Sequence, residues 1–67
     1  MRVLVSLEDQ PLLDTHTLFG CLWKAGIYPV GCELLGYQQR AILFSTPEHT
    51  DQAIAILKQM GIDAKRG

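Results

Sequence analysis

The chain has 67 residues, of which 48% are hydrophobic and 19% charged, and its formal net charge is -1 at pH 7. Residues 1–67 are therefore expected to form a single domain. Its near-neutral charge lacks the basic surface of a nucleic-acid-binding protein. Its apolar runs are shorter than the roughly 18 residues that a membrane span needs. Cys21 and Cys32 form no CxxC motif, and no pair of histidines stands at ligand spacing, so we expect neither a disulfide framework nor a metal or other cofactor.

The first predicted elements are a strand and a helix. Residues 2–7 are rich in branched side chains and alternate weakly, which predicts a β-strand with Val3, Val5 and Leu7 on one face. Downstream, apolar residues recur at i, i+3, i+4 and i+7, which predicts one buried helix face. The members of this stripe are Leu18, Cys21, Leu22 and Ala25. A Gly-Ile pair at 26–27 then ends the helix.

A hairpin and a second helix follow. The apolar stretches 30–35 and 41–44 flank a Gly-Tyr-Gln-Gln-Arg segment, which predicts an antiparallel hairpin. The helix begins either at Ser45-Thr46-Pro47-Glu48 or at a second cap, Thr50-Asp51. Its apolar stripe is Ala53, Ile56, Leu57 and Met60, and a second Gly-Ile pair at 61–62 ends it. The tail leaves room for one short final strand.

The resulting order is strand, helix, strand, strand, helix, strand. This order predicts an α+β, ferredoxin-like βαββαβ sandwich, in which an antiparallel four-stranded sheet carries two helices on one face. Each helix stripe then has an apolar sheet face to cover. No internal repeat or linker competes with this prediction.

The chain resembles an ACT domain over nearly its whole length, from Val3 to about Ala64. The resemblance depends on Asp9-Gln10-Pro11 after the first strand, on Ala25-Gly26-Ile27 at helical distance, and on Leu57-Lys58-Gln59-Met60-Gly61-Ile62. It implies a non-enzymatic regulatory module that binds an amino acid or a similar small metabolite, often at a homodimer interface. The ligand-facing positions that it implies are Asp9, Gln10, Pro11, Leu12, Leu13 and Tyr28. Leu12 and Tyr28 stand where the family often has glycine and asparagine.

The loop after the first strand has two interpretations. In the first, unpaired amides at the start of the helix hold the carboxylate of a ligand. In the second, Pro11 ends the strand, and Leu12 and Leu13 plug the space between sheet and helix. Asp14 or Thr15 then caps the helix.

A protein partner is the alternative to a metabolite. Phe19 and Trp23 stand four residues apart on the first helix, where they either widen the core or flank a surface for a partner or a ligand. His16 and His49 are isolated, and neither cysteine has a base beside it, so we expect no enzymatic activity. The start MRVLVSLED lacks the long apolar core of a signal peptide. We therefore expect a cytoplasmic homodimer, because oligomerisation is the remaining way to stabilise so small a core.

Overall fold

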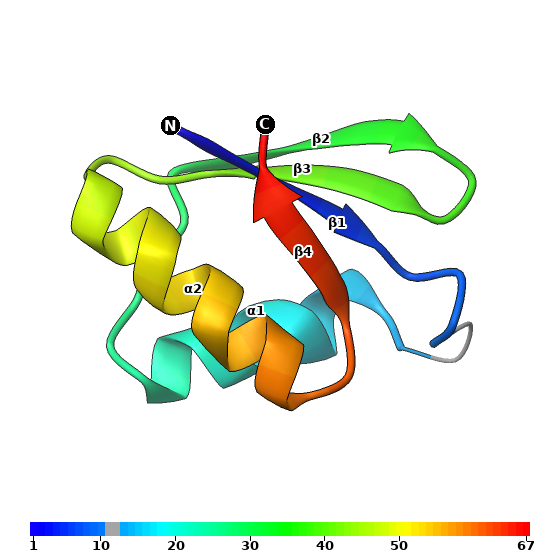
Figure 1. Ribbon diagram of the computed structural model, residues 1–67, viewed down its shortest axis with the longest axis horizontal. Helices are drawn as coiled ribbons and strands as arrows, with labels where there is room; N and C mark the ends of the chain where they lie inside the picture. The colour runs from blue at the N-terminus through cyan, green and yellow to red at the C-terminus, as the bar shows by residue number, and fades with distance from the viewer. Residues whose placement is uncertain (11–12) are drawn as a thin grey trace.

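The computed structural model describes residues 1–10 and 13–67, and within them the chain forms two helices and a four-stranded sheet. The elements are β1 (Arg2–Ser6), α1 (Thr15–Lys24), β2 (Gly31–Gly36), β3 (Gln39–Leu43), α2 (Pro47–Gln59) and β4 (Asp63–Arg66). The sheet has the order β2-β3-β1-β4, and all neighbouring strands are antiparallel (Figure 1). The predicted α+β class with an antiparallel four-stranded sheet is thus confirmed.

Both helices begin at a side-chain cap. The Thr17 amide donates to Oδ1 of Asp14 at 2.7 Å, and the His49 amide donates to Oγ1 of Thr46 at 3.2 Å. Each bond satisfies one of the amides that a helix start leaves unpaired. Asp14 rather than Thr15 therefore caps α1, and the earlier of the two predicted starts of α2 is correct, with Pro47 in its first turn.

Both helices also end in the same way. Gly26 and Gly61 have φ angles of 80° and 79°, in the left-handed region that glycine adopts without steric cost. The following amides, of Ile27 and Ile62, donate back to the carbonyls of Leu22 and Leu57 at 2.9 and 3.0 Å. This closes a Schellman motif at each end. The two Gly-Ile pairs thus turn the chain and also bury their isoleucines, each 2% exposed.

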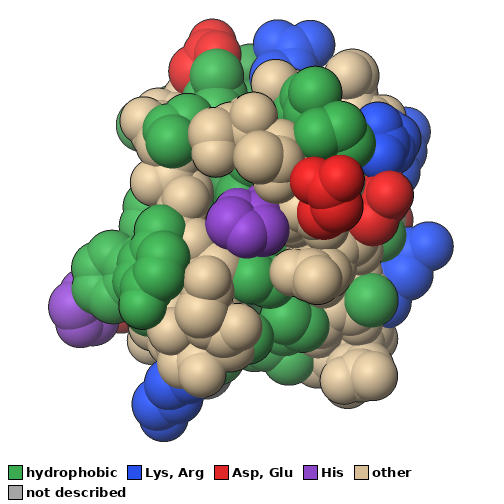
Figure 2. All heavy atoms as spheres, turned by 90° about the vertical axis from the view of Figure 1, so that its left-hand side faces the viewer, with side chains coloured by type: hydrophobic (Ala, Val, Ile, Leu, Met, Phe, Trp, Pro, Cys, Tyr) green, Lys and Arg blue, Asp and Glu red, His purple; other side chains and the backbone are tan. Residues whose placement is uncertain are grey.

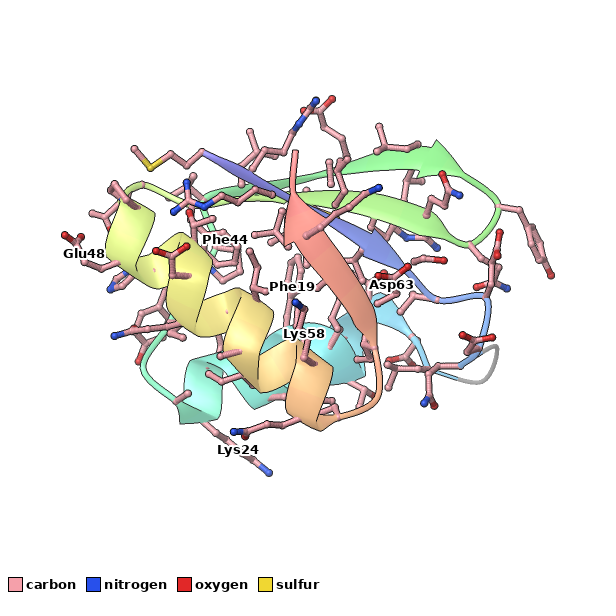
Figure 3. The ribbon with its side chains drawn as sticks, in the orientation of Figure 1. Phe19, Lys24, Phe44, Glu48, Lys58 and Asp63 are labelled. Carbon is pink, nitrogen blue, oxygen red and sulfur yellow. The ribbon has the colours of Figure 1, made fainter. Side chains whose placement is uncertain are left out.

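The core lies between the sheet and the helices. The predicted inward residues of the first strand are all buried, and they form one cluster with side chains from both helices and from β3 and β4. Its members are Val3, Val5, Leu7, Leu18, Leu22, Ile27, Ile42, Phe44, Ala53, Leu57, Ile62 and Ala64. Figure 3 shows Phe44 and, packed against the cluster, Phe19 in this space. Within residues 1–10 and 13–67, no helix is long and apolar enough to cross a membrane.

Two predicted stripes are wider than the buried faces. Cys21 is half-buried, and Ala25 is exposed because it forms the C-cap of α1, where the chain already leaves the helix. Ile56 and Met60 are half-buried at the border of the α2 face. Sequence spacing gives the direction of a stripe, but the partner surface determines its width.

Candidate functional site

The loop after β1 packs against the rest of the fold at two of its described positions. Leu13 is half-buried against the core cluster, and the side-chain amide of Gln10 lies beside Gly61, where a Cβ would be 3.4 Å from Nε2. Asp9 is exposed. The predicted ligand residues Pro11 and Leu12 lie outside the described residues. For Leu13, the packing agrees with the interpretation of the loop as a plug.

The start of α1 is occupied by the chain's own carboxylate. The backbone amide of Thr17 donates to Asp14 and is the main reason why the pKa of this carboxyl lies below its ordinary value; the Thr17 side chain adds to the effect. A negative group already sits at the positive end of the helix dipole. A ligand carboxylate would have to compete with Asp14 there, and the start of α1 by itself is therefore a poor anion site.

Tyr28, the remaining predicted ligand residue, lies far from the loop within one chain. It is exposed in the connection between α1 and β2. Figure 1 shows this connection, in green, at one end of the molecule and residues 8–10, in blue, at the opposite end. A single copy of the chain therefore does not bring Tyr28 together with Asp9 and Gln10.

The two aromatic side chains of α1 behave differently. The rings of Phe19 and Trp23 are 6.4 Å apart between centroids and tilted by 52°. Phe19 packs against the core cluster, whereas Trp23 is 47% exposed. Phe19 thus widens the core, and Trp23 is the member of the pair that a partner could reach.

No catalytic set is assembled from the described side chains. His16 is exposed and His49 half-buried, and Figure 2 shows the two histidines, in purple, apart on one face. No group of three or more His, Cys, Asp or Glu residues among those described could hold a metal ion. Desolvation raises the pKa of the Cys32 thiol; the Arg40 guanidinium opposes this rise and the Glu33 carboxylate adds to it. A raised pKa leaves less thiolate at neutral pH and makes Cys32 a weaker nucleophile.

An exposed apolar strand lies at the edge of the sheet. Among the described residues, five of the seven exposed large hydrophobic side chains fall between positions 28 and 37. They are Tyr28, Val30, Leu34, Leu35 and Tyr37. Strand β2 lies at the sheet edge, and residues 32–36 are all exposed. The run of apolar residues at 30–35 is typical of a buried strand, so its pattern did not indicate that these side chains are exposed.

The loop, Tyr28, Trp23 and the β2 edge are thus the candidate functional surfaces of this chain. No protein-family model, no curated protein and no solved structure matches it.

Proposed function

We propose that the chain is a non-enzymatic, ACT-like regulatory module that acts as a homodimer and binds an amino acid or a similar small metabolite. The element order and the sheet order β2-β3-β1-β4 support a ferredoxin-like plan. The single core cluster shared by α1, α2 and the sheet supports the placement of both helices on one face. The two Gly-Ile helix ends, which carried the resemblance, have the same capping geometry in the structure.

The exposed edge of β2 is the observation that carries the dimer. Leu34 is 75% exposed and Val30 67% exposed, on a strand whose outer edge has no partner among the described strands. An unpaired edge with apolar side chains is a template for pairing with another chain. A second copy related by a two-fold axis can pair with this edge, because the two β2 strands then run antiparallel and the sheet continues across the interface.

A two-fold axis perpendicular to the sheet places one β2 residue opposite its own copy. If that residue is Glu33, two carboxylates face one another, which is destabilising. If it is Leu34, two leucines meet, and Glu33 lies opposite Leu35 of the second copy. Of these two registers, the one centred on Leu34 avoids the repulsion, and we propose it for the dimer.

Antiparallel pairing also explains how the separated ligand residues could form one site. The start of β2 in one copy lies beside the end of β2 in the other. Tyr28 precedes β2, and residues 8–10 lie at the end of the sheet where β2 finishes (Figure 1). The dimer thus moves Tyr28 toward Asp9 and Gln10 of the second copy, and the ligand would bind between the two chains.

A protein-interaction subunit without a metabolite site is the second candidate, because Trp23 is 47% exposed on α1. In that case no metabolite stabilises the protein. A specific partner is then captured in a pull-down, and Trp23→Ala abolishes the capture.

Two measurements test the proposal. Sedimentation equilibrium at tens of micromolar should give twice the chain mass of 7.5 kDa, and a monomer would refute the dimer. A thermal-shift screen of amino acids should find one that stabilises the fold, by about 2.7 kcal/mol at 100 times its dissociation constant. If the dimer forms and no metabolite shifts the melting temperature, the ligand part of the proposal is wrong and the protein-interaction candidate is favoured.

A further inference from the structure

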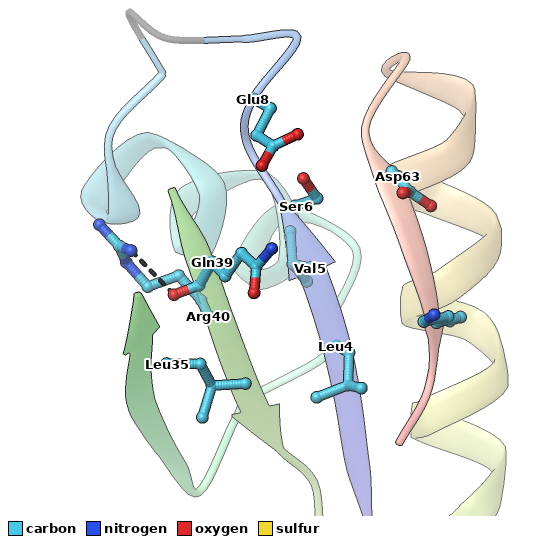
Figure 4. Close-up of a pocket in the computed structure, with 9 residues that line it drawn as sticks. Leu4, Val5, Ser6, Glu8, Leu35, Gln39, Arg40 and Asp63 are labelled. Carbon is cyan, nitrogen blue, oxygen red and sulfur yellow. Dashed lines mark hydrogen bonds between the residues drawn. The ribbon is translucent and has the colours of Figure 1, made fainter. Parts of the chain in front are cut away.

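A cavity of about 300 Å³ lies on the surface of the sheet. It opens over β3, β1 and β4, and Glu8 and Leu35 extend its wall (Figure 4). We propose that this cavity binds a small organic ammonium ion with a short apolar body.

The polar end of the cavity is a row of three side chains. Ser6 stands opposite Gln39 on one neighbouring strand and opposite Asp63 on the other. Directly opposed residues of an antiparallel sheet point to the same face, so a hydroxyl, an amide and a carboxylate lie side by side. Glu8 follows on from β1, and Figure 4 shows its carboxylate directed toward Ser6. This end therefore offers two carboxylates and two neutral oxygen acceptors.

The other end of the cavity is apolar. Leu4 lies on the same face as Ser6, two residues along β1, opposite Ala41 and Lys65. Leu35 is the extra residue of the irregularity between β2 and β3, since Leu34 pairs with Arg40 and Gly36 pairs with Gln39. Leu4 and Leu35 give a ligand's hydrocarbon part a surface to cover (Figure 4). Lys65, opposite Leu4 and two residues from Asp63 on β4, adds its methylene stem to this surface and brings a positive charge to the apolar end of the cavity.

The polar groups of the cavity are free to bind. Within residues 1–10 and 13–67, no side-chain hydrogen bond or ion pair engages Ser6, Glu8 or Asp63. Arg40, by contrast, donates from Nη1 to the carbonyls of Gly36, Tyr37 and Gln39 at 3.3, 3.4 and 2.9 Å. Its guanidinium is thus held at the hairpin, and Figure 4 shows it on the far side of Gln39 from Ser6.

This charge pattern selects the ligand class. An ammonium group between Glu8 and Asp63 gains two charge-assisted hydrogen bonds. A carboxylate on the carbon next to the ammonium, as in an amino acid, would lie beside Glu8 and Asp63 and not at the Leu4 end, where Lys65 stands, and it would be repelled. A bare divalent cation is disfavoured because Glu8 and Asp63 are the two carboxylates in the lining, and hard cations take six or more oxygen ligands.

The test uses the full chain labelled with ¹⁵N, titrated with 2-phenylethylammonium chloride and followed by amide NMR spectra. We expect saturable shifts in the millimolar range, concentrated at Ser6, Gln39 and Asp63 and their neighbours on the three strands. The comparison ligands are 2-phenylethanol, which lacks the charge, phenylalanine, which adds a carboxylate, and magnesium chloride. Each should bind much more weakly at these residues.

Variants separate the cavity from a general attraction of cations to the surface. Asp63→Asn and Glu8→Gln should each weaken binding by about two- to fivefold, the range for exposed ion pairs. The matched control is Glu48→Gln, an exposed carboxylate in the first turn of α2 that lies outside the cavity and the proposed dimer interface, and it should leave binding unchanged. The proposal is overturned if the shifts do not saturate, if the alcohol binds as well as the ammonium, or if Glu48→Gln weakens binding as much as Asp63→Asn. Shifts confined to Tyr28 and Asp9 would also overturn it and would instead favour the site of the dimer.

Discussion

Replacing Leu34 by serine is expected to convert the proposed homodimer into a monomer. Leu34 lies on the edge strand β2 and is 75% exposed in the single chain, so its side chain contributes little to the fold of one copy. In a dimer centred on Leu34, each leucine packs against its own copy across the two-fold axis. The substitution therefore removes apolar contact from the interface and leaves the core unchanged.

The size of the effect follows from the exposure of Leu34. Full burial of a leucine side chain is worth about 1.5 to 3 kcal/mol. Since 75% of Leu34 is available for burial, each copy contributes about 1 to 2 kcal/mol. Because both copies carry the substitution, the dimer loses about 2 to 4 kcal/mol of binding free energy, and its dissociation constant rises about 30- to 1,000-fold.

Sedimentation equilibrium across a concentration series measures this change, and circular dichroism confirms that the Leu34→Ser chain is folded. Trp23→Ala is the comparison variant, because it removes an exposed apolar side chain, 47% accessible, from α1 and not from the β2 edge. We expect it to leave the dissociation constant unchanged. The edge model is refuted if Leu34→Ser remains dimeric at concentrations where the wild type is dimeric, or if Trp23→Ala dissociates the dimer instead.

Three further predictions concern the fold and its titrating groups. Gly26→Ala, at a φ angle of 80°, should lower the free energy of unfolding by about 1 to 2 kcal/mol. Gly20→Ala should raise it by about 0.5 to 1 kcal/mol, because a Cβ at Gly20 has no described atom within 4 Å apart from its chain neighbours and the backbone of its own helix. Urea denaturation measures both. In a Cys21→Ser background, the rate at which iodoacetamide alkylates Cys32 should rise with pH. The midpoint of this rise should lie above the value of about 8.5 for a free cysteine, because desolvation raises the pKa of the thiol. A midpoint below that value would contradict the desolvation. Because the folded-state pKa of Asp14 is lowered, its capping contribution is present above the ordinary aspartate value of about 3.9 and is lost as the pH falls through the lower folded value. The difference in unfolding free energy between wild type and Asp14→Ala should therefore shrink in acid, and a constant difference from pH 7 to pH 2 would show that the charge of Asp14 plays no part.

The candidate surfaces were only partly readable from the sequence. Phe19 and Trp23 were expected either both to widen the core or both to flank a partner or ligand surface, whereas in the structure Phe19 packs on the core and Trp23 is exposed, a division that spacing on a helix did not predict. The cavity on the sheet could not be foreseen at all, because Ser6, Gln39 and Asp63 come from three strands that are far apart in the chain and meet only through the register of the sheet.

Local chemistry determined where the elements of this protein begin and end. The caps Asp14 and Thr46 and the left-handed glycines 26 and 61 act within a few residues of themselves, so their effect is visible in the sequence. Tertiary structure decided which apolar residues are covered. Leu34 and Leu57 are the same type of residue, yet Leu34 is 75% exposed and Leu57 is fully buried. The reason is that β2 lies at the edge of the sheet, whereas Leu57 of α2 belongs to the core cluster. Burial depends on what packs on a side chain from elsewhere in the chain, and that information is not local.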